Sequence, residues 1–220
     1  MPYKDSLPYP KKQLHPPMQL FFMSGKGAQG FEGLFFSLNQ GTIKQIPKEK
    51  EILMKVIICL DERGGRLFNG RRQASDRNVL RDMMRETGVL KKDGSLLTPE
   101  QAAEQHRLLL ISPFSEKLFE ESDWSAYVRV LEDPLKEAEA AASAGKQGTE
   151  PVVFVEDEDL AAHVGSMDHL LIYRWKRVYP YDSLLEISLD DFKLQKESRL
   201  AGFSHDMVYK ELYVKKEASK

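Results

Sequence analysis

The last third of the chain, residues 151–216, decides the expected fold because its elements follow one another in a specific order. Two apolar runs come first, Val152-Val153-Phe154-Val155 and Leu170-Leu171-Ile172-Tyr173-Arg174-Trp175, separated by an acidic, helix-like segment over Glu156 to His163. After Tyr179-Pro180-Tyr181-Asp182 come Leu184-Leu185-Glu186-Ile187, Leu189-Asp190-Asp191-Phe192-Lys193-Leu194 and Val208-Tyr209-Lys210-Glu211-Leu212-Tyr213-Val214. This succession predicts a strand, a short helix, a second strand, an acidic turn and a terminal pair of antiparallel strands.

Strands and helices also alternate upstream of this stretch. Short apolar or alternating runs predict strands at Val56 to Leu60, Leu108 to Ile111 and Tyr127 to Leu131. Helical spacing and capping residues predict helices at Asp76 to Thr87, Thr98 to His106, Phe114 to Glu121 and Asp133 to Ala144. Such alternation is typical of βαβ units. We therefore predict one α/β domain over residues 54–216, with a mostly parallel central sheet, antiparallel C-terminal strands and flanking helices; residues 217–220 form a tail.

Composition narrows the function classes. The 220 residues are 41% hydrophobic and 30% charged, which suits one soluble globular domain. A net charge of -2 gives no global electrostatic reason to bind nucleic acid, and no apolar run is long enough to span a membrane. The single cysteine, Cys59, excludes an intrachain disulfide framework and fits a reducing, cytoplasmic setting. The five histidines lack metal-ligand spacing, so we expect no metal site and a small molecule as partner.

Residues 1–53 differ from the rest, because prolines and glycines interrupt any helical or strand period. Met54 opens the first apolar run, and Lys50-Glu51 can be encoded by a purine-rich ribosome-binding sequence two codons upstream of it. We therefore expect Met54 to be the biological start and residues 1–53 to be a translated leader. The alternative is a disordered arm that belongs to the protein.

The loop Phe68-Asn69-Gly70-Arg71-Arg72-Gln73-Ala74-Ser75-Asp76-Arg77 carries the highest density of polar groups in the domain. In the expected fold it lies at the carboxyl edge of the first strand, where open α/β sheets bind ligands. Bidentate hydrogen bonds to a phosphate or carboxylate are predicted for Arg71, Arg72 and Arg77. An amide-bearing ring is predicted to contact Asn69 and Gln73. The alternative is a solvated loop that leads into a capped helix, with its arginines paired to Asp76 or Asp82.

The element order from Pro151 onward, after the apolar strand at Val56 to Leu60, resembles the dihydrofolate reductase family. The resemblance implies that family's α/β fold and an active-site loop at Gly64 to Gln73. It also implies that Asp76 is the catalytic carboxylate, which would accept paired hydrogen bonds from a pterin and support proton delivery. The alternative role for Asp76 is that of a helix cap only.

The positions where that family binds its cofactor have changed. Its Gly-Gly pair after the strand corresponds here to Glu156-Asp157-Glu158-Asp159. We predict that these four acidic residues start a helix and that their charges repel a pyrophosphate. Its Gly-Arg-x-Thr corresponds to Ser112-Pro113-Phe114-Ser115, and its Leu-Pro-Trp to Arg71-Arg72-Gln73. The sequence thus argues against ordinary NADPH binding. It favours a divergent protein that binds a small pterin- or nucleotide-like ligand, and the alternative is an active NAD(P)H-dependent reductase with altered cofactor contacts.

A second resemblance points to a nuclease. The apolar opening strand, Asp61, the glycine turn and Phe68-Asn69-Gly70-Arg71-Arg72-Gln73 look like a small bacterial family sometimes labelled ribonuclease Z. Metallo-β-lactamase-type nucleases need a His-x-His-x-Asp-His cluster to activate water, and the sequence lacks it. Ser204-His205-Asp206 contains the residue types of a hydrolase triad. We interpret it as a turn between the terminal strands, because adjacent strand residues point to opposite faces.

Overall fold

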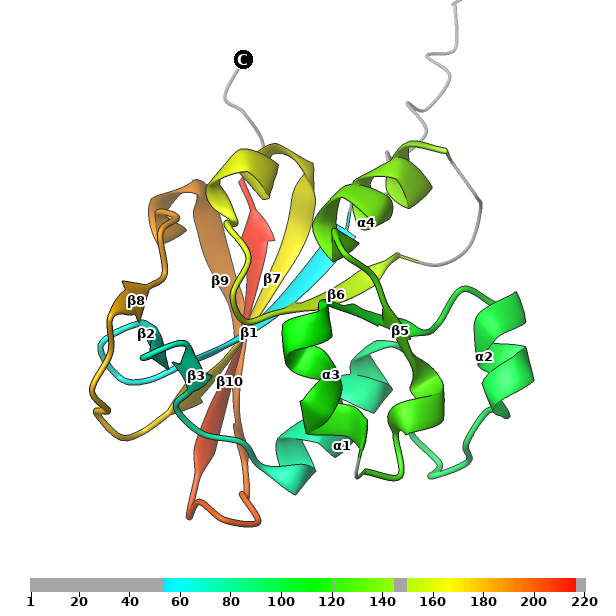
Figure 1. The fold of residues 1–220 in the computed structure, drawn as a ribbon, viewed down its shortest axis with the longest axis horizontal. Helices are drawn as coiled ribbons and strands as arrows, with labels where there is room; N and C mark the ends of the chain where they lie inside the picture. Colours follow the sequence, from blue (N-terminus) through cyan, green and yellow to red (C-terminus); the bar gives the residue numbers. More distant parts are fainter. Residues whose placement is uncertain (1–53, 121, 145–149, 217–220) are drawn as a thin grey trace, which may run out of the picture. The chain divides into compact units, whose positions relative to one another are not determined.

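The computed structural model describes residues 54–120, 122–144 and 150–216. The expectations for residues 1–53 and 217–220 fall outside these described residues. The main feature is a seven-stranded sheet in the order β5-β4-β6-β1-β7-β10-β9, with helices packed on it (Figure 1). No helix of the described segments is both long and apolar enough to cross a bilayer.

Five neighbouring strands of this sheet run parallel: β5 (Val128–Val130), β4 (Leu109–Ile111), β6 (Val152–Val155), β1 (Met54–Leu60) and β7 (Met167–Trp175). The C-terminal strand β10 (Val208–Lys215) is antiparallel to both of its neighbours, β7 and β9 (Phe192–Leu200). A mostly parallel sheet with antiparallel C-terminal strands is the predicted architecture, and the structure confirms it.

Two hydrophobic clusters cover the two faces of the sheet. The first joins α1 (Arg77–Glu86), α2 (Pro99–Glu104) and α3 (Pro113–Glu120) to side chains such as Ile57 and Phe154. The second joins α4 (Pro134–Ser143) to Val56, Ile58 and Val155. Successive strand side chains alternate between the faces, so a continuous apolar run such as β1 contributes to both clusters.

The helix ends follow from local residues. The Asp76 carboxylate caps α1 by accepting from the Asn78 N–H, and Gly88, at φ +76°, follows its last turn. A capping box between Thr98 and Gln101 starts α2, with Pro99 in its first turn. Three 3₁₀ turns complete the set of helical segments that the structure describes: η1 (Ser125–Tyr127), η2 (Ala161–Ser166) and η3 (Leu189–Asp191).

One predicted element was wrong in type, and a predicted strand was confirmed with a shifted start. The segment after β6 is not helical at Glu156 to Leu160, and the helical turn there is η2, which begins at Ala161. Glu156 instead turns into the protein, where it finds hydrogen-bond partners. The strand expected from Tyr127 starts at Val128, because Tyr127 belongs to η1 and its hydroxyl donates to the Leu97 carbonyl at 2.8 Å.

The expected active-site loop at Gly64 to Gln73 is instead largely a β-hairpin. Strands β2 (Gly65–Phe68) and β3 (Arg71–Arg72) pair antiparallel, and β8 (Ser183–Leu184) completes a small second sheet. Asn69 and Gly70 connect them with φ of +51° and +62°, the values of a type I′ hairpin turn. The buried Asp61 carboxylate anchors this sheet by accepting from the N–H groups of Gly65 at 2.7 Å and Tyr179 at 3.0 Å.

Candidate functional site

Two pockets flank the polar stretch that the sequence singled out. The larger, about 820 Å³, is the α1–α3 pocket, and its lining includes Arg77, Arg81, Lys117, Trp124, Phe203 and Ser204. The smaller, about 500 Å³, is the hairpin pocket, and its lining includes Phe68, Asn69, Arg71, Gln73, Tyr179 and Pro180. Arg72 lines both. The predicted site residues are therefore divided between two neighbouring cavities.

Arg72 forms a partly buried ion pair with Glu156. Its Nε lies 2.8 Å from Oε1 and its Nη2 lies 2.9 Å from Oε2, which is the bidentate geometry of a strong pair. Ser115 Oγ donates to the same Oε2 at 2.7 Å, and Arg72 Nη2 also donates to the Phe114 carbonyl at 3.2 Å. The partner of Arg72 is thus Glu156, not Asp76 or Asp82, and the charge of this guanidinium is balanced within the protein.

Glu156 of this pair occupies a position at which the family resemblance implies a cofactor contact. Glu156 directly follows β6, where the family resemblance calls for glycine, and its side chain is only 7% exposed. Burial, and then the charge of Glu156, raises the pKa of the nearby Cys59 thiol, with a smaller opposite effect from Arg72. That thiol is therefore protonated and unsuited to act as a nucleophile.

Asp76 caps α1 and also ties a distant loop to it. Oδ1 accepts from the Asn78 N–H at 2.8 Å, while Oδ2 accepts from the N–H groups of Phe203 at 2.7 Å and Ser204 at 2.8 Å. Burial by itself raises the pKa of Asp76, but the backbone N–H groups of Phe203, Ser204 and Asn78 outweigh it and lower the pKa to about 2. The helix-cap role is confirmed, and the catalytic role of Asp76 stays a prediction.

Ser204 and His205 lie in the loop between β9 and β10, as the predicted turn requires. Adjacent residues need not diverge in a loop as they do in a strand, and Ser204 Oγ and His205 Nδ1 lie 3.1 Å apart, so the stated ground for excluding a proton relay was wrong. The same Nδ1 also faces Asp76 Oδ2 at 3.4 Å, while Nε2 faces the Tyr179 hydroxyl at 3.2 Å. A hydrolase triad places nucleophile and carboxylate on opposite ring nitrogens, so this arrangement does not activate Ser204.

The other predicted residues occupy different environments. The Asn69 N–H donates to Asp182 Oδ2 at 2.7 Å, and Gln73 Nε2 donates to the Pro180 carbonyl at 3.3 Å. Arg71 is exposed beside the hairpin pocket. The Arg77 guanidinium lies 5.0 Å from the centre of the Phe203 ring. Ligand binding by these residues stays a prediction.

Several residues that line the α1–α3 pocket were not predicted as site residues, among them Arg81, Lys117, Trp124 and Phe203. These four carry a charge or an aromatic ring that a ligand could contact. Arg81 follows Arg77 by four residues, so the helical period places both on one face of α1, and that spacing was available in the sequence. The remaining three come from α3, from the segment before η1 and from the β9–β10 loop, which only the tertiary fold brings together.

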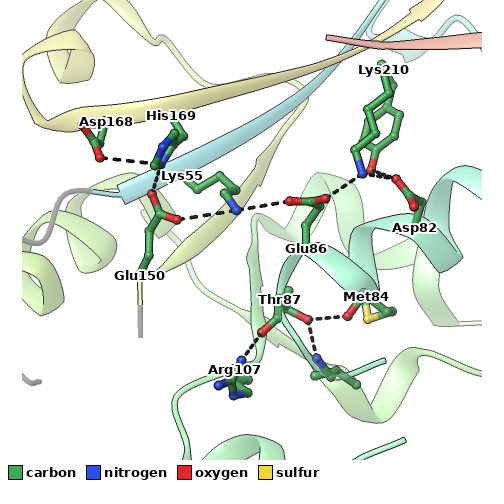
Figure 2. A network of polar contacts seen from close by, with 12 residues as sticks. Lys55, Asp82, Met84, Glu86, Thr87, Arg107, Glu150, Asp168, His169 and Lys210 are labelled. Atoms are coloured by element: carbon green, nitrogen blue, oxygen red, sulfur yellow. Dashed lines mark hydrogen bonds and ion pairs between the residues drawn. The ribbon is translucent and has the colours of Figure 1, made fainter. Parts of the chain in front are cut away.

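A second polar cluster lies elsewhere, around the start of β1 (Figure 2). The residues covered by the structure include one group with metal-ligating side chains within mutual reach, Glu150, Asp168 and His169. His169 Nδ1 contacts Glu150, which raises the pKa of the imidazole, and Lys55 Nζ lies 3.5 Å from the same carboxylate. A lysine beside the group disfavours a further cation. The cluster continues through Lys55 and Glu86 to Lys210, so we interpret it as a structural ion network.

Comparison with known proteins supports the fold. No protein-family model matches the sequence, and no curated protein matches it significantly. Among solved structures, the chain is similar to a dihydrofolate reductase from Enterococcus faecalis complexed with NADP(H) and RAB-propyl. The TM-score is 0.50 and the identity 14%, over 76% of this chain and 98% of that enzyme. This likeness confirms the dihydrofolate reductase-like α/β fold, and none of these comparisons supports the ribonuclease Z label.

Proposed function

We propose that this protein binds a small pterin- or nucleotide-like ligand in the α1–α3 pocket, on a dihydrofolate reductase-like fold that has lost its usual NADPH contacts. The main observation that supports this proposal is the pocket and its lining. Its volume of about 820 Å³ suits a small organic molecule, and it combines Arg77, Arg81 and Lys117 with the aromatic rings of Trp124 and Phe203.

The residues directly after β6 support the loss of NADPH contacts. A dinucleotide needs bare backbone and unopposed positive charge at its pyrophosphate. Here Glu156 is buried against Arg72, and the exposed carboxylates of Asp157 and Asp159 come directly after it. These negative charges repel a pyrophosphate, and the side chains fill space that glycine leaves open.

Tryptophan fluorescence tests the proposal, because the chain has two tryptophans and Trp124 lines the pocket while Trp175 is 2% exposed. We expect 2,4-diaminopteridine, guanosine or guanosine 5′-monophosphate to change the emission of the full-length protein in a saturable way. Trp124→Phe should abolish the change, and Arg63→Ala, an exposed arginine that is not part of the pocket, should leave it intact. Failure of all three probes at about 1 mM contradicts the proposal.

The second candidate is an active reductase with altered cofactor contacts, and the observation that favours it is the structural likeness to an enzyme complexed with NADP(H). Under our proposal we expect no saturable change of NADPH fluorescence up to about 1 mM, because the exposed carboxylates of Asp157 and Asp159 repel the pyrophosphate. Saturable binding that is lost in Arg71→Ala, at an exposed arginine of the hairpin pocket, favours the reductase. In that case Asp76 is the proposed catalytic carboxylate, which accepts hydrogen bonds from the pterin and supports proton delivery, and Asp76→Asn should stop NADPH oxidation with dihydrofolate.

A further inference from the structure

We infer that the α1–α3 pocket selects its ligand by a phosphate group attached to a flat heteroaromatic ring, and not by the paired carboxylate hydrogen bonds that hold a pterin. This inference rests on the proposed function and narrows its ligand class to nucleotide-like phosphomonoesters. Three independent features of the pocket support it: a carboxylate with no remaining capacity, unpaired cations and exposed aromatic rings.

The carboxylate comes first. A carboxylate has about four lone-pair sites, and those of Asp76 accept from the Asn78, Phe203 and Ser204 N–H groups and from Ser204 Oγ at 3.1 Å. Its side chain is 0% exposed, although Asp76 is one of the residues that line the pocket. A pterin would have to displace the β9–β10 loop before its ring nitrogens reached Asp76, and the three hydrogen bonds from Phe203 and Ser204 oppose that displacement.

The cations come second. Arg77 and Arg81 lie one turn apart on α1, and Lys117 reaches the same pocket from α3. Within the described parts of the chain, none of these three side chains has a carboxylate at ion-pair distance, and Asp123 is the one other acidic residue in the lining. Arginine forks match the oxygens of a phosphate bidentately, and a dianion is the ligand that three such cations favour.

The aromatic rings come third. Phe203 is 67% exposed at the pocket, with the Arg77 guanidinium 5.0 Å from its ring centre. Trp124 is partly buried and lies 6.2 Å from the Tyr127 ring, which fixes its position. Aromatic faces beside cations suit the stacking of a heterocycle whose phosphate is held by the arginines. The pocket therefore offers separate places for a ring and for an anion.

The experiment compares guanosine 5′-monophosphate, guanosine and 2,4-diaminopteridine by calorimetry on the full-length protein. We expect the monophosphate to bind about tenfold or more tightly than guanosine, with an affinity that falls as salt rises, and 2,4-diaminopteridine to bind no better than guanosine. Arg77→Ala combined with Arg81→Ala should reduce the monophosphate to the affinity of guanosine, while Arg63→Ala should not. All three arginines are exposed, so thermal unfolding should show each variant folded.

The outcomes separate this inference from the proposed function. Equal affinity of guanosine and its monophosphate, or tight binding of 2,4-diaminopteridine that Asp76→Asn abolishes, overturns phosphate recognition and leaves the ligand-binding role standing. Inhibition of monophosphate binding by inorganic phosphate supports the anion subsite. If none of the three probes binds, the proposed function and this inference are both wrong.

Discussion

At the residue scale, the role of each polar side chain depends on hydrogen-bond and ion-pair partners that are distant in the sequence. Arg72 and Glu156 form an ion pair at 2.8 Å, and Asp76 accepts backbone hydrogen bonds from the start of α1 through Oδ1 and from the β9–β10 loop through Oδ2. Arg77 and Arg81, by contrast, have no carboxylate at ion-pair distance among the described residues. Identical residue types in one short stretch thus divide into groups with a structural partner and groups that we propose to contact a ligand.

Asp76→Asn should destabilise the protein by about 2 kcal/mol near neutral pH, because the amide replaces an acceptor that faces buried N–H groups. The folded-state pKa of Asp76 is lowered to about 2, so its stabilising contribution is complete above the ordinary value of about 4 and is lost as pH falls through about 2. Urea unfolding should therefore show a constant difference between wild type and variant at pH 5–8 that shrinks in acid.

Asp123→Asn is the matched control for this experiment, because Asp123 is exposed and lines the same pocket. Its effect on the free energy of unfolding should stay close to zero at every pH. A difference for Asp76→Asn that persists unchanged down to pH 2 contradicts the assigned hydrogen bonds.

At the element scale, residues that favour positive φ mark the helix end and the hairpin turn that the structure shows. Gly88 ends α1 with a left-handed φ, and the Asn69-Gly70 pair forms a hairpin turn where a loop was expected. The Asn-Gly signal between Phe68 and Arg71 was present in the sequence and specifies a two-residue hairpin. The acidic run from Glu156 to Asp159 gave a wrong prediction of a helix start. The amino acids that favour a helix start also occur in loops, and here Glu156 turns inward.

Gly88→Ala should lower the free energy of unfolding by about 1–2 kcal/mol, because a Cβ is unfavourable at φ +76°. The added Cβ also meets Arg107 Nη1 at 2.0 Å, although that flexible side chain can move. Gly165→Ala is the control, since its φ lies outside the left-handed region and its Cβ would meet open space. Chemical denaturation of both variants measures the contrast, and equal effects would argue against a conformational role for Gly88.

At the whole-molecule scale, one sheet and two hydrophobic clusters join all the helices of the described segments. Helices on both faces of a largely parallel sheet make a self-contained α/β architecture. Met54 opens β1 and is fully buried, and the expectation that the domain begins there stays a prediction.

We therefore expect a chain that starts at Met54 to fold in one cooperative transition, with a Tm within a few degrees of the full-length protein. Thermal unfolding of both chains by circular dichroism measures this. A large loss of Tm in the shorter chain would show that residues 1–53 contribute to the folded domain. Peptide mapping of the natural protein then tests the start site, and peptides from residues 1–53 would contradict the leader hypothesis.

Local patterns predicted the buried strands, the caps of α1 and α2 and the antiparallel C-terminal pair, because periodicity and capping are local properties of the chain. They missed the β2–β3 hairpin, and they did not predict which polar groups meet, which depends on the tertiary fold. Arg72 and Glu156 are 84 residues apart, and Asp76 and Ser204 are 128 apart. Ionic and hydrogen-bond partners at such separations depend on the path of the whole chain, so local patterns identify the polar stretch but not its partners.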